Sequence, residues 1–157
     1  MHRRPRLILI AALAAVVALT AAGTAWWWLH RPVRVDPPTA ASDPACTALA
    51  RRLPATVQGN ARVATSSDSP AVAAWGDPAV IWRCGVAPPG PTTDECIEVD
   101  GVDWVRHPLS DGQSFTTFGR DPAVQVLVPH DYAPEPLLLP PFSRAVSVLP
   151  QGTLRCR

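Results

Sequence analysis

The stretch Cys96-Ile-Glu-Val-Asp-Gly-Val-Asp-Trp-Val105 decides the fold, because it alternates apolar and polar residues on both sides of Asp100-Gly101. Glycine takes positive φ without steric cost and aspartate tolerates it, so this dipeptide predicts a two-residue hairpin turn. The expected cross-strand pairs are Val99 with Val102, Glu98 with Asp103, and Ile97 with Trp104. One face of the hairpin is therefore apolar, and the other sets two carboxylates opposite each other.

Three further segments have the composition of strands. They are residues 79–84, 114–118 and 123–128. In the first, Val80, Trp82 and Cys84 share one face, because side chains alternate along a strand. Residues 64–78 are rich in Ser, Asp, Pro and Gly and indicate a loop.

Two short helices complete the expected domain. Ser42 or Asp43 can cap a helix over residues 45–53, and Pro140 can begin another that ends near Leu149. The sum is an α+β fold with a small antiparallel sheet of about four to five strands and two short helices, stapled by disulfides and preceded by one transmembrane helix.

The N-terminus predicts that transmembrane segment. Residues 1–6 form a basic leader, and residues 7–29 carry no charge and end in three tryptophans, as at a membrane interface. Residues 30–43 then predict a proline-containing tether, and residues 44–157 an extracytoplasmic domain. The alternative is a cleaved signal peptide, which would leave the domain secreted.

All four cysteines follow the apolar segment, at positions 46, 84, 96 and 156. An even number on one side indicates structural disulfides in an oxidising compartment. Of the three possible connectivities, we favour Cys84 with Cys96 across a Pro/Gly loop, and Cys46 with Cys156.

The charge distribution argues against nucleic acid as a partner. Residues 1–35 carry five arginines and no acid, whereas residues 36–157 carry nine arginines against 13 acids, a net charge of −4. Phosphate binding needs basic residues clustered on one face, and the arginines of this acidic part are scattered.

No catalytic set, metal site or cofactor site is predicted. His107, Asp111 and Ser114 lie close in the chain, but proximity in sequence does not make a triad, and no G-x-S-x-G motif is present. His130 and Asp131 follow too far from His107, without the spacing typical of zinc ligands.

Six residues are candidates for a ligand surface. The opposed acids Glu98 and Asp103 repel each other unless Arg83, Arg106, a cation or a basic ligand offsets them. Three tryptophans could line an aromatic groove, although such residues more often form the core. A further candidate, Arg120, could hold a turn through Asp121 or recognise a ligand. The tryptophans are Trp75, Trp82 and Trp104.

Three segments together resemble the actinobacterial domain of unknown function 3515. They are Trp75-Gly-Asp-Pro-Ala-Val-Ile-Trp-Arg-Cys-Gly85, Cys96 to Trp104, and Phe115-Thr-Thr-Phe-Gly-Arg-Asp-Pro-Ala-Val124. The resemblance spans about Cys46 to Cys156. It implies an actinobacterial source and a secreted, lipid-anchored or single-span envelope protein, and it implies no catalytic residue. No lipobox precedes Cys46.

The expected function is a binding or interaction module at the outer face of the cytoplasmic membrane, more a non-enzyme than an enzyme. Its expected partners are the membrane, through the N-terminal helix, and an envelope protein or cell-wall component. An envelope hydrolase or a sensor of cell-wall fragments is the alternative.

Overall fold

The computed structural model describes residues 13, 15–24, 26 and 31–156. The chain divides into two compact units, Met1–Pro32 and Val33–Arg157. In the first unit, residues 15–24 are helical. The second unit contains the sheet and every functional candidate named above.

The expected transmembrane helix at residues 7–29 is not found. Within the described part of the chain, no helix is both long enough and apolar enough to cross a bilayer. Of the expected span, residues 7–12, 14, 25 and 27–29 lie outside the described residues.

The second unit is built on one eight-stranded antiparallel sheet, which is larger than the four to five strands expected. The strand order is β1-β2-β3-β4-β8-β7-β6-β5. After β4 the chain leaves the sheet, restarts at the far edge with β5 and returns strand by strand until β8 pairs with β4. The strands are β1 (Thr56–Val57), β2 (Asn60–Val63), β3 (Val72–Trp75), β4 (Val80–Val86), β5 (Cys96–Val99), β6 (Val102–Pro108), β7 (Gly112–Thr117) and β8 (Ala123–Pro129).

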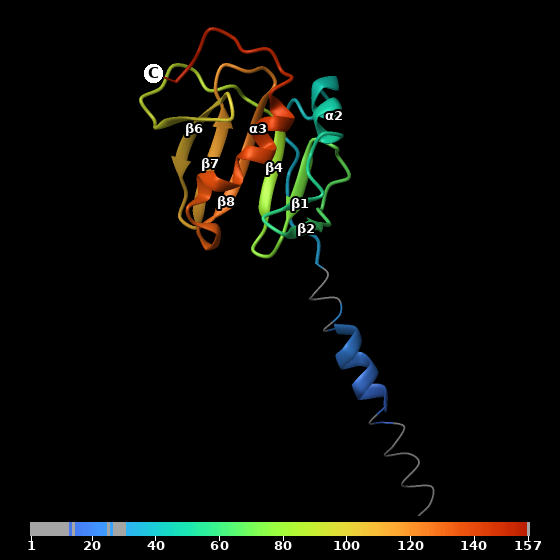
Figure 1. The fold of residues 1–157 in the computed structure, drawn as a ribbon. Helices are drawn as coiled ribbons and strands as arrows, with labels where there is room; N and C mark the ends of the chain where they lie inside the picture. The colour runs from blue at the N-terminus through green and yellow to red at the C-terminus, as the bar shows by residue number, and fades with distance from the viewer. Residues whose placement is uncertain (1–12, 14, 25, 27–30, 157) are drawn as a thin grey trace, which may run out of the picture. The chain divides into compact units, whose positions relative to one another are not determined.

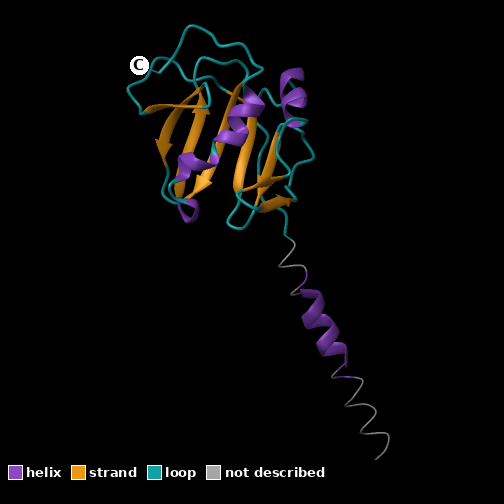
Figure 2. Cartoon of the chain, in the orientation of Figure 1, coloured by secondary structure: helices purple, strands orange, loops and turns teal. Residues whose placement is uncertain are grey.

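Short helices accompany the sheet (Figure 2). They are α2 (Pro44–Ala50), α3 (Pro140–Val146) and the 3-10 turns η1 (His130–Tyr132) and η2 (Glu135–Leu138). Figure 1 shows α3 lying across one face of the strands. We call this the core face, because it carries Trp82 and Trp104, and we call the opposite one, which carries Glu98, the outer face.

The hairpin expected at Asp100-Gly101 is confirmed in every pair. Val99 lies opposite Val102, Glu98 opposite Asp103 and Ile97 opposite Trp104. Asp100 and Gly101 both take positive φ, at 50° and 75°. Two successive positive φ values are the geometry of the type I′ turn, whose twist matches that of the flanking strands.

An aromatic cluster holds the core face to α3. The Phe142 ring stacks on Trp82 at 5.7 Å and meets the edge of Trp75 at 5.3 Å between centroids. The indole of Trp104 donates a 3.0 Å hydrogen bond to the Ser143 hydroxyl from the same helix, and all these side chains are fully buried. The helix therefore covers the sheet through both packing and one buried polar contact.

The stretch expected as a loop, residues 64–78, contains a central strand. Val72-Ala-Ala-Trp75 forms β3 and is buried at all four positions. A strand covered on both faces has no polar–apolar alternation, so the pattern that reveals a half-exposed strand is missing. Strands β1 and β2 give no strand signal because they are short and mostly exposed, without a regular apolar alternation.

Both disulfides form, but the expected pairing is wrong. Cys46 joins Cys84, and Cys96 joins Cys156. Strands β4 and β5 stand four positions apart in the sheet, about 19 Å, and a disulfide spans at most about 7 Å between Cα atoms.

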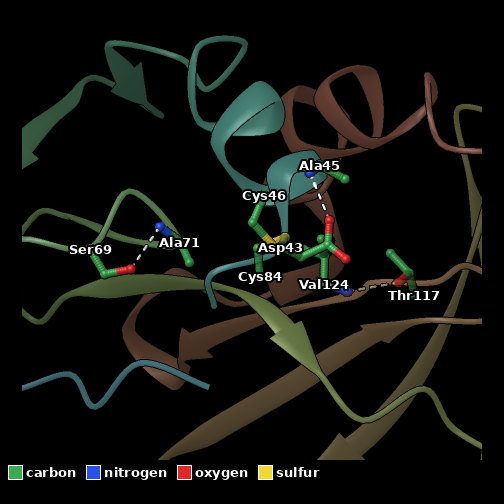
Figure 3. The surroundings of a disulfide bond; sticks show 8 residues. All are labelled: Asp43, Ala45, Cys46, Ser69, Ala71, Cys84, Thr117 and Val124. Atoms are coloured by element: carbon green, nitrogen blue, oxygen red, sulfur yellow. Dashed lines mark hydrogen bonds between the residues drawn. A yellow bond between two sulfur atoms is a disulfide. The ribbon is translucent and has the colours of Figure 1, made fainter. Parts of the chain in front are cut away.

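The Cys46–Cys84 bond fastens α2 to the core face. Figure 3 shows it beneath the helix, whose first turn is capped by Asp43 through a 2.7 Å bond from the Ala45 amide. This crosslink closes 38 residues, and in the chain-entropy model it adds about 4 kcal/mol of stability.

Much of the expected tether belongs to the folded unit. Val33 bridges Thr65, and Val35 is buried. Ala40 donates a backbone hydrogen bond to Gly85, at 3.2 Å. Gly85 has a φ of +92°, and a Cβ there would lie 2.4 Å from the Ala40 carbonyl, so the close approach of this segment to β4 requires glycine.

Replacing Ser143 with Ala should destabilise the domain by about 2 kcal/mol, because the buried Trp104 indole would lose its acceptor. Ser147 is the exposed C-cap of the same helix, and its hydroxyl donates to the Arg144 carbonyl. The S147A variant should therefore stay within about 0.5 kcal/mol of the parent. Urea unfolding followed by tryptophan fluorescence measures both, and equal losses would contradict the role given to Ser143.

Candidate functional site

A cleft of about 480 Å³ lies at the β5 edge of the sheet. One wall is the loop before β5, and the other is the C-terminal tail, which Figure 1 marks at this end of the sheet. We call it the tail cleft. Its lining residues are Pro91, Thr92, Thr93, Asp94, Cys96, Phe118, Thr153, Leu154, Arg155 and Cys156.

The tail that forms one wall is fixed in place. Cys156 is bonded to Cys96 of β5. Gln151 donates from its side chain to the carbonyls of Phe118 and Leu154, at 3.0 and 2.7 Å. These contacts, together with the disulfide, hold a segment without helix or strand structure against the sheet.

The tail cleft is polar and carries both signs of charge. Asp94 lies on the loop wall and Arg155 on the tail wall, and both are exposed. The hydroxyls of Thr93 and Thr153 add neutral donors and acceptors. Phe118 is 6% exposed and supplies an apolar surface. Such a lining suits a ligand that offers hydrogen bonds and charge at several points.

The three tryptophans form core and present no ligand surface. Trp75, Trp82 and Trp104 are all 0% exposed. Trp75 donates its indole hydrogen bond to the Pro54 carbonyl, at 3.1 Å. An aromatic groove made of these side chains would require the sheet and α3 to separate.

Glu98 and Asp103 lie opposite each other as expected, but the arginines expected to offset them bond to other residues. Glu98 accepts a 2.9 Å bond from the Gly101 amide and stays exposed. Asp103 is 8% exposed, and its charge interacts favourably with the guanidinium of Arg120. The two proposed partners are occupied elsewhere: Arg106 with Glu95 at 2.7 Å and Arg83 with Gln125 at 3.2 Å.

The Arg120 side chain hydrogen-bonds to backbone carbonyls and not to the carboxylate of Asp121. Its guanidinium is buried and donates to the carbonyl of Leu149, and at 3.4 Å to that of Gly101. Burial is the main influence on the pKa of Arg120 and lowers it, Asp103 opposes this, and the positive charge of Arg155 adds to it. Arg120 thus ties the β7–β8 turn to the hairpin turn and to the end of α3.

The residues considered for a triad are only partly brought together. His107 and Ser114 face each other across β6 and β7. The Ser114 hydroxyl, however, donates to the His107 backbone carbonyl at 3.4 Å, not to its ring. Asp111 contributes a backbone carbonyl that accepts from the amide of His130.

A histidine–carboxylate pair joins His130, which the sequence offered only as a weak metal ligand, to Glu135, which it did not single out. His130 Nδ1 contacts Glu135 Oε1 at 2.7 Å, with the imidazole half exposed and the carboxylate buried. The pKa of Glu135 is held below its usual value, first by a hydrogen bond from its own backbone amide and then by His130. Among the described residues, no group of three metal-binding side chains is found.

The fold and cleft define a disulfide-bonded α+β domain with a single antiparallel sheet, covered by a helix on one face and fitted with a polar cleft at one edge. The chain belongs to the DUF3515 family, described as proteins of unknown function, whose model matches residues 7–154. No curated protein and no solved structure matches it.

The Glu135 pair has a definite pH signature. Because its folded pKa is depressed, the carboxylate stabilises the fold above its unfolded pKa, near 4.5, and this contribution disappears as the pH falls through the folded value. Replacing Glu135 with Gln should therefore cost about 1 kcal/mol near neutral pH, and this cost should shrink as the pH falls below about 4.5. Urea unfolding of both proteins measures the difference, and a gap that persists in acid would refute this role.

Proposed function

We propose that the chain is an exported binding module that takes an envelope protein or a cell-wall component in the tail cleft. The carrying observation is that both walls of this cleft are joined by one disulfide, Cys96–Cys156. A binding surface made of irregular chain gains affinity when it is held in its bound shape beforehand. The crosslink provides that support for the tail.

Export is supported by the cysteines. All four are paired, and Cys46 and Cys84 are buried where a reductant reaches them only through opening. Such bonds persist in oxidising compartments and are rare in the cytosol. The uncharged stretch near the N-terminus is the segment that would direct the chain there, whether it is then removed or retained.

The exported form should contain no reactive thiol. A maleimide–polyethylene glycol reagent added to denatured cell extract should leave the chain unshifted on a gel, and should add mass only after reduction. A peptide map without reductant should then show Cys46 linked to Cys84 and Cys96 linked to Cys156. A chain labelled without reductant would oppose residence outside the cytoplasm.

The tail cleft should contact the ligand in living cells. A photo-crosslinking amino acid placed at Thr93 or Thr153, on opposite walls, should yield adducts in the full-length chain. The same probe at Leu137, which is 63% exposed on η2, is the matched control and should yield none. Mass spectrometry of the adduct distinguishes a protein partner from a glycan.

Removing each disulfide in turn should distinguish an effect on the tail cleft from an effect on overall stability. The pair C96S and C156S releases the tail wall, whereas the pair C46S and C84S removes the bond beneath α2. Each costs about 4 kcal/mol in the chain-entropy model. Only the first should abolish the adducts at Thr93, and retention of adducts after tail release would refute the proposed site.

A hydrolase of envelope material is the second candidate, and one contact favours it. The buried carboxylate of Glu135 contacts Nδ1 of His130 and fixes the orientation of the imidazole ring. In this arrangement Nε2 is the ring nitrogen that can accept a proton. In the described chain no hydroxyl or thiol contacts this ring, so the attacking group would be a water molecule.

A further inference from the structure

The last strand of the sheet, β5, leaves half of its backbone groups without a strand partner. The amide of Arg106 donates to the Glu95 carbonyl at 2.7 Å, and these two residues continue the register of the β5–β6 pair. In an antiparallel pair, alternate residues bond across and the others point away. Ile97 and Val99 therefore bond to β6, while Cys96 and Glu98 direct their N–H and C=O groups outward.

This edge borders the tail cleft. Cys96, which lines the cleft, shares the outer face with Glu98, because side chains alternate along the strand. Asp94 lies in the bend just before the strand and lines the same cleft. A chain that added to β5 would place every second side chain on that same face. The opposite edge of the sheet ends in β1, only two residues long, which offers much less backbone to a partner.

We infer that an extended polypeptide segment with a basic side chain binds as a ninth strand on the outward edge of β5, with alternate side chains in the tail cleft. This rests on the proposed function and names its partner class. Strand addition supplies affinity through backbone hydrogen bonds and specificity through pockets for alternate side chains. Both components are present here, on adjoining surfaces.

Charge selects a basic segment. Two acids near the edge are paired, Glu95 with Arg106 at 2.7 Å and Asp100 with Arg144 at 3.5 Å. Within the described part of the chain, Asp94 and Glu98 have no arginine partner. A basic residue directly opposite Glu98 forms a favourable cross-strand pair.

Two features limit the choice of partner. Arg155 on the far wall repels further basic residues, so one basic position beside Glu98 fits best. A second copy of this chain would bring the acids of both edges together, which disfavours pairing between copies. The net charge of −4 over residues 36–157 also draws a basic partner toward the domain.

The probe is a nine-residue peptide with arginine at its centre and alternating threonine and valine around it. Its control is the same peptide with glutamate at the centre. Titrated into the ¹⁵N-labelled full-length chain, the arginine peptide should shift the amide signals of Cys96 and Glu98 and slow their hydrogen exchange. The glutamate peptide should bind about fivefold more weakly or not at all.

Two variants of Glu98 test the edge: Glu98→Lys changes the charge alone, and Glu98→Pro removes the charge together with an outward N–H. Glu98→Pro removes an outward N–H without removing a bond to β6, since proline is tolerated at such edge positions, and it should abolish binding. Glu98→Lys should weaken binding about fivefold. Asp68→Lys makes the same change of charge on an exposed residue outside this cleft and should leave binding intact.

The outcomes separate the two proposals. If neither peptide shifts the edge amides, or if the arginine peptide binds the Glu98→Pro variant normally, strand addition is refuted, and the acids serve only to keep edges of copies apart. Adducts at Thr93 would then still support the tail cleft as a binding site for another ligand. If the Glu98→Pro variant fails to fold, two measurements still test strand addition. They are amide exchange in the parent chain and the titration of the Glu98→Lys variant.

Discussion

Burial of the aromatic face of a single sheet is the constraint on which the rest of this structure depends. A sheet with one apolar face must cover that face, and here the short helix α3 does so through Phe142, between Trp75 and Trp82. The indole of Trp104 adds a directional contact to Ser143. The chain after Leu149 continues to the β5 end of the sheet, where it forms one wall of the tail cleft.

The disulfides lie where that packing is thinnest. The helix α2 has only seven residues, too few to be stable alone, and Cys46 joins it to β4. The tail has no regular structure, and Cys156 joins it to β5. Each bond thus holds a segment that has little packing of its own, and the second bond gives a functional surface a defined shape.

The candidate binding surfaces lie at the β5 edge of the sheet. The chain enters the second half of the sheet at its far edge, so β5 has a partner on one side only. Exposed edges are a liability that proteins protect with charge, and Asp94 and Glu98 provide it. The same features, beside a fixed polar cleft, also describe a site for an incoming strand. The buried Arg120 keeps the neighbouring turns in place without offering a charge to solvent.

The sequence by itself determined the local features with a strong physical signal. Asp100-Gly101 fixed the hairpin and its register, the alternation of Val80, Trp82 and Cys84 identified a core face, and three segments identified the family. The opposition of Glu98 and Asp103 followed from that register alone.

Only the tertiary structure decided what depends on distance across the sheet. The order of strands separates β4 from β5, which determines the disulfide pairing and excludes the one inferred from chain proximity. Strand β3 escaped prediction because it is buried on both faces, and the His130–Glu135 pair because two 3-10 turns bring its members together. The tail cleft joins residues about 60 positions apart, as its disulfide shows, and no local pattern carries that information.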